Sequence, residues 1–183
     1  TVIALHTKEG VVVYANDFKL DNHPIIGKKP AYDELKALGK KNVQVLVCES
    51  VRAFDLRKTP SEIIARDMLR DVLLSCDNKN GIIVTTFSSH LARLKSIVEF
   101  GKTMRRKVVF LGRSLAKYTE AAEKIGLINF SRSVEIVKYA KQIKKRLNEI
   151  NKEGREKYLL VVTGHQGEPK STLSKMVTQE IPF

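Results

Sequence analysis

The sequence predicts an α/β fold, with a mostly parallel, doubly wound sheet that carries helices on both faces. One observation and its physical reason lead to this prediction. From residue 43 onward, apolar runs typical of buried strands alternate with amphipathic stretches in the order β-α-β-α-β-α-α-β-α. This alternation is typical of parallel sheets, because each parallel strand needs a crossover, usually helical, to reach the next one.

The individual elements follow from local signals along the chain. Strands are expected over residues 2–6, 11–14, 43–48, 81–87, 107–111 and 158–162, with a hairpin turn at residues 8–10. Helices are expected over residues 31–38, 91–104, 115–125 and 134–152, after the capping box at residues 59–62, and from Lys170 onward. The opening hairpin cannot bury a face by itself. We therefore expect it to edge the sheet or to come from a larger protein.

The composition is that of a globular protein. The chain has 183 residues, 43% hydrophobic and 29% charged, which suits one domain or slightly more. Its two cysteines, Cys48 and Cys76, make no disulfide framework, and Cys48 is expected to be buried in its strand. This usage favours a reduced, cytoplasmic setting. No apolar run approaches a membrane span and no signal peptide is evident, so no membrane partner is expected.

The charge balance favours a polyanionic partner. Lys and Arg number 33 against 20 Asp and Glu, a net charge of +13. The excess gathers at residues 105–107 and again at Lys138, Lys141, Lys144, Lys145 and Arg146. Nucleic acid is the commonest partner of such a field. The alternative is a basic surface that serves solubility alone.

Polar segments follow the expected parallel strands. They are Glu49-Ser50, Ser88-Ser89-His90, Gly112-Arg113-Ser114 and Gly164-His165-Gln166-Gly167-Glu168. In a parallel sheet the carboxyl ends of all strands lie on one edge, where ligands of open α/β sheets bind. Hydroxyl and N–H groups there suit phosphate oxygens, and Arg113 adds a charged fork. Each segment taken singly is also an ordinary helix cap.

The glycine-containing loop after the last strand has the spacing of a phosphate-binding motif but not its chemistry. Gly164 and Lys170-Ser171 match the P-loop pattern, yet Pro169 replaces its second glycine. Proline lacks an N–H and has a fixed φ, so the phosphate cradle would lose a donor. This disfavours a P-loop NTPase and leaves a nucleotide-binding α/β protein as an alternative.

An acidic residue, Asp17, closes the second expected strand, where it is well placed for a metal or a catalytic water. Asp21 and His23 add two further potential ligands, without a recognised ligand spacing. The alternative is a plain turn, because Asp and Asn favour such positions.

Five segments of the chain together match the motifs of one known enzyme family. They are VVYANDFKLD at residues 12–21, VCES at 47–50, TFSSHLAR at 86–93, FLGRS at 110–114 and the loop TGHQGEP at 163–169. They resemble, in the same order, the GDFK(L/F)D, E-S-T, TFSS…R, F-x-GRS and TGSQGEP segments of the ribonuclease J family of metallo-β-lactamase and β-CASP nucleases. The resemblance covers nearly the whole chain.

The resemblance implies domains and roles. Residues 1–50 would be part of a metallo-β-lactamase domain, and residues 51–183 the β-CASP RNA-binding domain. Asp17 matches the metal-bridging aspartate, and Glu49 matches the acidic residue beside the catalytic site. The residues implied to face RNA are Ser88, Ser89, Arg113, Ser114, Gly164, His165, Gln166, Gly167 and Glu168. The intact enzyme would be a homodimeric 5′-to-3′ exoribonuclease, in some members also an endonuclease, with two zinc ions.

The chain also departs from the family pattern. Asn16, Val51 and His165 stand where the family has Gly, Thr and Ser. No H-x-H-x-D-H segment is present, and the chain has only four histidines. One carboxylate cannot hold two cations. We therefore expect this segment alone to bind no zinc pair and to cleave no RNA.

Two alternatives stay open beside the ribonuclease. One is a non-catalytic nucleic-acid-binding domain on the same scaffold, which differs in lacking the upstream H-x-H-x-D-H segment. The other is a nucleotide-binding α/β protein, whose melting temperature ATP or GTP would raise while RNA would not.

Overall fold

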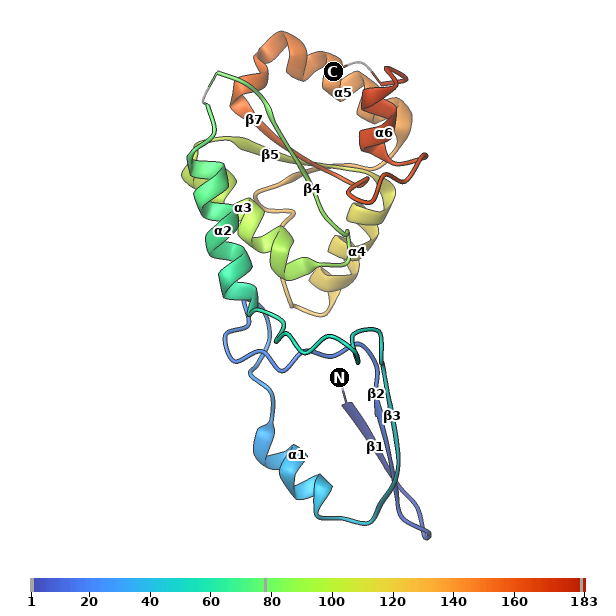
Figure 1. Cartoon of the computed structure of the whole chain (residues 1–183). Coiled ribbons are helices and arrows are strands. Elements are labelled where there is room, and N and C mark those ends of the chain that lie inside the picture. The colour runs from blue at the N-terminus through green and yellow to red at the C-terminus, as the bar shows by residue number, and fades with distance from the viewer. Residues whose placement is uncertain (1, 78, 182) are drawn as a thin grey trace. The chain divides into compact units, whose positions relative to one another are not determined.

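The computed structural model describes residues 2–77, 79–181 and 183, and the chain divides into two compact units (Figure 1). The first unit comprises Thr1–Pro24 and Lys28–Glu62. The second comprises Ile25–Gly27 and Ile63–Phe183.

The first unit contains a three-stranded sheet in the order β1-β2-β3 and one helix, α1 (Tyr32–Gly39). β1 (Val2–His6) and β2 (Val11–Ala15) form the expected antiparallel hairpin. β3 (Val43–Cys48) pairs with β2 in parallel. The prediction that residues 43–48 join the later strands in one sheet is therefore wrong, because the partner of β3 is a strand of the hairpin.

The expectation that β3 is a buried strand is also wrong. Val45, Leu46 and Val47 are 46%, 61% and 45% exposed, and Cys48 is exposed as well. Among the described residues of this three-stranded sheet, only those of the central strand β2 include buried ones, namely Val11, Val13 and Ala15. The apolar run thus predicted the strand correctly, but it did not predict how far the strand is buried, because burial depends on what packs against the sheet.

The second unit confirms the predicted α/β fold. Four parallel strands form a sheet in the order β4-β7-β5-β6. These strands are β4 (Ile82–Thr85), β5 (Lys107–Leu111), β6 (Glu135–Val137) and β7 (Tyr158–Val162). Its helices are α2 (Glu62–Leu74), which starts in the first unit, α3 (Leu91–Thr103), α4 (Arg113–Lys124), α5 (Ala140–Glu153) and α6 (Thr172–Val177). A short 3-10 turn, Arg155–Lys157, leads into β7.

The side chains of successive residues in the inner strands point to opposite faces of the sheet and pack in two separate hydrophobic cores. Phe110 of β5 and Val161 of β7 pack with residues of α2, α3 and α4. Val109 and Leu160 pack on the other face with residues of α5 and α6. Both faces of the sheet are therefore covered by helices.

The predicted helix over residues 134–152 is wrong in its first part. Glu135–Val137 is strand β6, which pairs with β5, and α5 begins only at Ala140. A three-residue edge strand is too short to show a period of its own, so the basic helix after it dominated the pattern. The other predicted strands and helices appear with boundaries that differ by at most a few residues.

None of the helices formed by the described residues combines the length and the apolar character needed to cross a lipid bilayer.

Candidate functional site

The carboxyl ends of the four parallel strands lie level with one another. Val162 of β7 is paired with Thr85 of β4 and with Leu111 of β5, which in turn is paired with Val137 of β6. The segments after these strands therefore start at one edge of the sheet, as predicted for three of them. Glu49-Ser50 follows β3 of the other sheet, so its predicted place on this edge is wrong.

The chain leaves this edge in opposite directions. After β5 it enters α4, whose Leu115 packs in the core on one face of the sheet. After β7 it enters α6, whose Met176 packs in the core on the other face. Where neighbouring strands send their connections to opposite faces, a crevice opens outside their carboxyl ends. This crevice between β5 and β7 is the candidate site.

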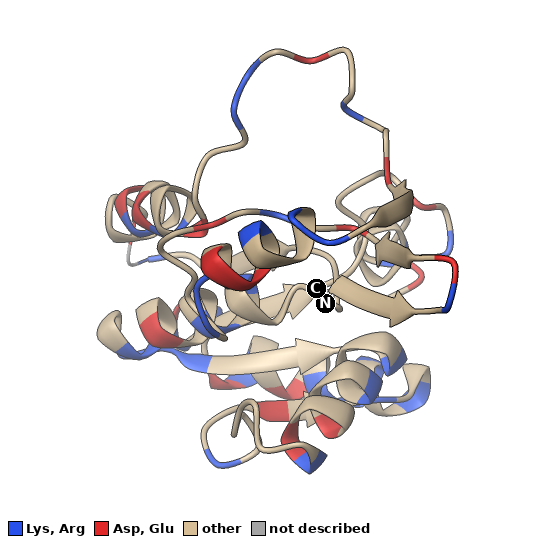
Figure 2. Ribbon diagram, turned by 90° about the horizontal axis from the view of Figure 1, so that it is seen from below, with Lys and Arg blue, Asp and Glu red and all other residues tan. Residues whose placement is uncertain are grey.

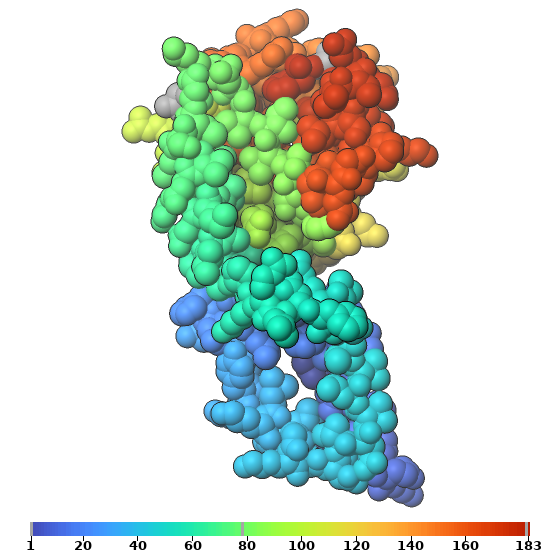
Figure 3. All heavy atoms as spheres, in the orientation of Figure 1, coloured from blue at the N-terminus to red at the C-terminus, as the bar shows by residue number. Residues whose placement is uncertain are grey.

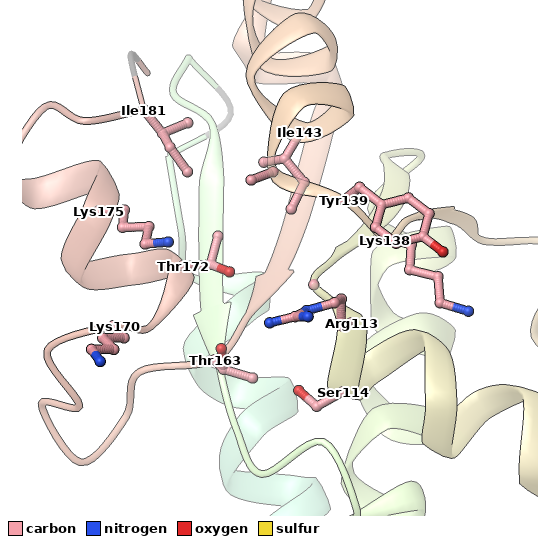
Figure 4. Close-up of a pocket in the computed structure, with 12 residues that line it drawn as sticks. Arg113, Ser114, Lys138, Tyr139, Ile143, Thr163, Lys170, Thr172, Lys175 and Ile181 are labelled. Carbon is pink, nitrogen blue, oxygen red and sulfur yellow. The ribbon is translucent and has the colours of Figure 1, made fainter.

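A pocket of about 470 Å³ occupies the crevice (Figure 4). We call it the basic pocket, and its lining comes from the segments after β5, β6 and β7. The lining residues are Gly112, Arg113, Ser114, Lys138, Tyr139, Ala140, Ile143, Thr163, Lys170, Thr172, Lys175 and Ile181. Four of them are cationic and none is acidic.

The cations of the basic pocket differ in their partners. Lys138 pairs with Glu120 at 3.3 Å. Within the described part of the chain, Arg113, Lys170 and Lys175 form no ion pair with an acidic side chain. Arg113 and Lys175 extend from opposite sides toward the middle of the pocket (Figure 4). This arrangement leaves positive charge that an anion can neutralise.

The N-termini of two helices also meet the basic pocket. The N-cap of α4 is Gly112, with φ +138°, and the N-cap of α5 is Tyr139; neither makes a side-chain capping bond. By contrast, the His90 side chain accepts from the N–H of Arg93 at the start of α3. Uncapped N–H groups and the positive end of the helix dipole favour an anion.

The loop between β7 and α6 carries the glycine motif. Gly164 has φ +126°, and a Cβ there would lie 2.6 Å from Ser171 Oγ, so no larger residue fits. Glu168 accepts from the N–H of Gln166 at 3.0 Å, so its carboxylate holds the loop itself. Residues 165–170 are exposed, and they form part of the red-orange surface in Figure 3. The conformation of the loop is thus held by contacts among its own residues, and its outer face is exposed to solvent.

A ring contact connects this loop to the turn after β4. The rings of Phe87 and His165 pack edge to face with centroids 3.9 Å apart. Ser88 and Ser89 follow in a turn closed by the bond from His90 N–H to Phe87 carbonyl, 3.0 Å long. Because β7 lies between β4 and β5, this contact is on one side of β7 and the basic pocket on the other. The predicted RNA-facing residues of the second unit therefore form two groups along one edge.

The two predicted catalytic carboxylates lie in the first unit. Ala15 of β2 is paired with Cys48 of β3, so Asp17 and Glu49 follow neighbouring strand ends. Glu49 accepts from the N–H of Val51 at 2.8 Å. No group of three or more His, Cys, Asp or Glu residues suited to a metal occurs in the described ranges. Two carboxylates are fewer ligands than a pair of zinc ions requires, so the residues of this chain do not by themselves fit that centre.

Asp21, a further potential ligand, has a structural role. It accepts from the N–H of Glu62, the first residue of α2, at 2.8 Å, and from the Ser61 hydroxyl. Burial raises the pKa of this carboxyl, but the bonds from Glu62, Ser61 and His23 together with the charge of Lys19 outweigh burial and hold the pKa well below its usual range.

The basic clusters seen in the sequence are only partly available to a ligand. Arg106 is 5% exposed, and its guanidinium donates to the carbonyls of Asn80, Tyr158 and Asp77. Arg146 is bonded to glutamates of β6 and α5. Along the helices, Lys and Arg are interspersed with Asp and Glu (Figure 2). Of the clustered charges that were expected to attract a polyanion, Arg106 and Arg146 are therefore already engaged within the protein.

Sequence reasoning missed Lys170 and Lys175 as pocket residues. Lys170 ends the glycine loop, and Lys175 lies on the following helix, one turn after its start. Only the order of the strands shows that Lys175 faces Arg113 across the crevice.

Comparison with known proteins agrees with this architecture. A family model described as the β-CASP domain of ribonuclease J matches residues 79–182. Ribonuclease J of Methanocaldococcus jannaschii is 47% identical over 180 residues, which cover 98% of this chain and 40% of that protein. Ribonuclease J of Pyrococcus abyssi is 44% identical over 182 residues, which cover 99% of this chain and 40% of that protein. Ribonuclease J of Sinorhizobium meliloti is 29% identical over 181 residues, which cover 98% of this chain and 30% of that protein. The chain thus spans about 40% of the length of the first two relatives.

Proposed function

The chain belongs to the ribonuclease J β-CASP family, and from this membership we propose that it is the RNA-binding segment of a metal-dependent ribonuclease. The observation that carries the proposal is the shared edge of the four-stranded sheet, where three polar segments and a basic pocket come together. Phosphate groups dominate the affinity of proteins for nucleic acid, and this edge offers cations and hydroxyl groups to them.

The two groups of residues along the edge would share the contacts to RNA. Near the end of β4, the RNA would be contacted by Ser88, Ser89 and the outer face of the loop at residues 164–168. Near the end of β5, the RNA would be contacted by Arg113 and Ser114. We propose that these hydroxyl groups and the guanidinium bind phosphate and sugar, and because such contacts carry no sequence information we expect little sequence preference.

In the intact protein the reaction would be hydrolysis of RNA phosphodiester bonds. A pair of zinc ions, when bound, supplies an activated water and neutralises charge that develops on the phosphate. From this chain, Asp17 would provide a metal-bridging carboxylate and Glu49 an acidic group on the adjacent strand end. The remaining ligands would come from parts of the intact protein outside these residues. The homodimer, the 5′-to-3′ direction and the cytoplasmic location rest on the resemblance and the composition.

The test of RNA binding uses fluorescence anisotropy with a labelled single-stranded RNA that carries a 5′-hydroxyl. The variant Ser88→Ala/Ser89→Ala/Gln166→Ala removes three polar groups from the β4 side of the edge. We expect it to weaken binding by about tenfold, since each lost hydrogen bond to a charged group weakens binding. Lys152→Gln, in the last turn of α5, removes one exposed charge and serves as the control. Equal affinity of the triple variant and the wild type would overturn the proposal.

A second test concerns catalysis by this chain alone. The purified chain with added zinc should leave a labelled RNA intact, because two carboxylates do not make a binuclear site. Zinc-dependent cleavage that Asp17→Ala abolishes would show that the chain carries a complete centre.

A further inference from the structure

We propose that Asn80 is a site of spontaneous deamidation, at which the backbone nitrogen of Gly81 attacks the asparagine side chain and Arg106 promotes the reaction. Asn80 and Gly81 form the only Asn-Gly pair in the sequence. They lie between α2 and β4, just before the amino end of β4. The proposed RNA contacts follow the carboxyl ends of the strands. The modification site is therefore separate from them.

The backbone N–H of Gly81 is placed to become the nucleophile. Glycine has no Cβ, so its nitrogen approaches the preceding side chain with the least steric hindrance. The pairing of β4 with β7 begins at Ile82, so the N–H of Gly81 lies outside that ladder. The Asn80 side chain is exposed, and its amide donates to Asp77 only at 3.5 Å. Such a long hydrogen bond does little to keep the side chain from turning toward the nitrogen.

Arg106 acts on the same peptide group through the carbonyl oxygen of Asn80. Its Nη1 donates to that oxygen at 2.7 Å. Arg106 is 5% exposed, so water screens its charge only weakly. When the Gly81 nitrogen loses its proton, the negative charge spreads by resonance onto the Asn80 oxygen. Because a charge-assisted hydrogen bond stabilises this anion more than the neutral peptide, Arg106 raises the fraction of reactive nitrogen.

The reaction takes up water and releases ammonia. Hydroxide removes the proton of the Gly81 N–H, and the nitrogen attacks Cγ of Asn80. The new N–Cγ bond forms, and the Cγ–Nδ2 bond breaks as ammonia leaves with a proton from water, which gives a cyclic succinimide. Water then adds to either carbonyl of the succinimide. Cleavage of its bond from Cγ to nitrogen gives aspartate, and cleavage at the former backbone carbonyl gives isoaspartate.

The contact with Arg106 also directs the second step. The former backbone carbonyl is the one that the guanidinium contacts, so it is polarised toward attack by water. The carboxylate that this attack creates then faces the guanidinium, which stabilises it. We therefore expect the folded protein to give a larger share of isoaspartate than the unfolded chain gives.

Conversion to isoaspartate should loosen the turn before β4. Isoaspartate adds a carbon atom to the main chain next to Gly81, where space is short. A Cβ on Gly81 would lie 3.1 Å from Cβ and 3.2 Å from the carbonyl oxygen of Arg155. The turn must shift to make room. The shift moves the Asn80 and Asp77 carbonyls, to which Arg106 donates, and so lowers stability.

The experiment incubates the whole chain at mildly alkaline pH, in buffer and in urea, and follows each asparagine by peptide mapping with mass spectrometry. We expect Asn80 to convert about fivefold faster in the folded chain than in urea, since hydrogen bonds to charged groups are the stronger ones. Asn129 is exposed and is followed by Phe130, so it should stay unconverted as the internal control. Asn80→Ser should remove the modified peptide. The comparison with urea needs no substitution of Arg106, whose variants can fail to fold.

The outcomes separate the site from the role of Arg106. Absence of conversion at Asn80 in both conditions would overturn the site. A folded rate equal to or below the rate in urea, or an equal share of isoaspartate in both, would refute the contribution of Arg106. The converted chain should unfold at a lower urea concentration and bind labelled RNA like the fresh chain. Loss of RNA affinity on conversion would contradict the separation of this turn from the RNA contacts, whereas failure of the fresh chain to bind RNA would refute only the proposed function.

Discussion

The rings of Phe87 and His165 pack edge to face, with centroids 3.9 Å apart and an interplanar angle of 77°. Phe87 precedes the turn after β4, and His165 lies in the glycine loop after β7. The contact therefore joins two segments that are 78 residues apart in the chain (165 − 87) and that we propose to contact the same RNA. The signature that this loop resembles has a serine at the position of His165, and a serine side chain has no ring for such a contact.

The first prediction concerns this ring pair. His165→Ser should free the glycine loop from the turn after β4 and lower RNA affinity by about twofold, because an aromatic pair at an exposed position contributes about 0.5 kcal/mol. Phe87→Leu should have a similar effect, and the double variant should lose no more than either single one. Anisotropy titrations of the four proteins give the coupling. Additive losses would mean that the rings act independently.

The second prediction distinguishes two adjacent arginines. Arg106→Gln should destabilise the fold by about 3 kcal/mol, because it takes the buried guanidinium donor away from three carbonyls in two segments, of which that of Tyr158 is buried. Arg105→Gln alters an exposed residue and should change the free energy of unfolding by less than about 0.5 kcal/mol. Urea unfolding followed by circular dichroism measures both. Comparable stability of the two variants would contradict the structural role of Arg106.

The third prediction concerns the partly buried side chain of Arg146. Its guanidinium contacts Glu135, Glu149 and Glu153 and the hydroxyl of Tyr158. The hydrogen bond and charge of Glu135, with the hydrogen bonds to Glu153 and Tyr158, outweigh burial and raise the pKa of Arg146 further above its ordinary value. Its side chain is 16% exposed, so Arg146→Met should destabilise the protein by about 2 kcal/mol and leave unpaired glutamates.

Lys145 is the matched control for Arg146. Its side chain is 83% exposed and pairs with Glu149 only at 4.0 Å. Lys145→Met should change stability by less than about 0.5 kcal/mol in the same urea titration. An equal effect of the two substitutions would show that the network around Arg146 adds nothing to stability.

The fourth prediction concerns acid stability. The folded-state pKa of Asp21 lies below its unfolded value, so its contribution is complete above the unfolded pKa of about 3.9. The contribution is lost as the pH falls below that value toward the folded pKa. Asp21→Asn should therefore destabilise the protein by about 1 kcal/mol near neutral pH, and the difference should shrink below about pH 4.

Unfolding titrations between neutral pH and the acid transition test the Asp21 prediction. Asp33→Asn, which changes an exposed carboxylate on α1, should show no such convergence. A difference between wild type and Asp21→Asn that stays constant through the acid range would show that the carboxylate bonds to Glu62 and Ser61 do not depend on its charge.

Particular residues show how far the sequence could predict the site. Arg113, Ser114 and the glycine loop were expected at the carboxyl edge, because turns after apolar runs are recognisable locally. Lys175 was not expected, although it lies only a few residues beyond that loop. Its place opposite Arg113 depends on β7 lying next to β5, which no short window of sequence reveals.

Burial was the other quantity that local patterns misjudged. Arg106 and Lys107 look alike in the sequence, yet Arg106 is buried under the carbonyls of Asn80 and Tyr158 while Lys107 is exposed. Val45 to Val47 look like a core strand and are exposed. In both cases the outcome depends on what packs against the segment from elsewhere in the chain.

By itself, the sequence determined the kinds and order of most strands and helices, the parallel α/β class, the family, and the polar segments after the strands. Hydrophobic periodicity, capping residues and glycine turns are local properties, so short windows of sequence carry them. Only the tertiary structure decided that β3 pairs with the hairpin, that β7 lies between β4 and β5, and that Arg113 and Lys175 face one cavity. These outcomes depend on contacts between residues far apart in the chain, whose free energies come from packing and burial rather than from local preference.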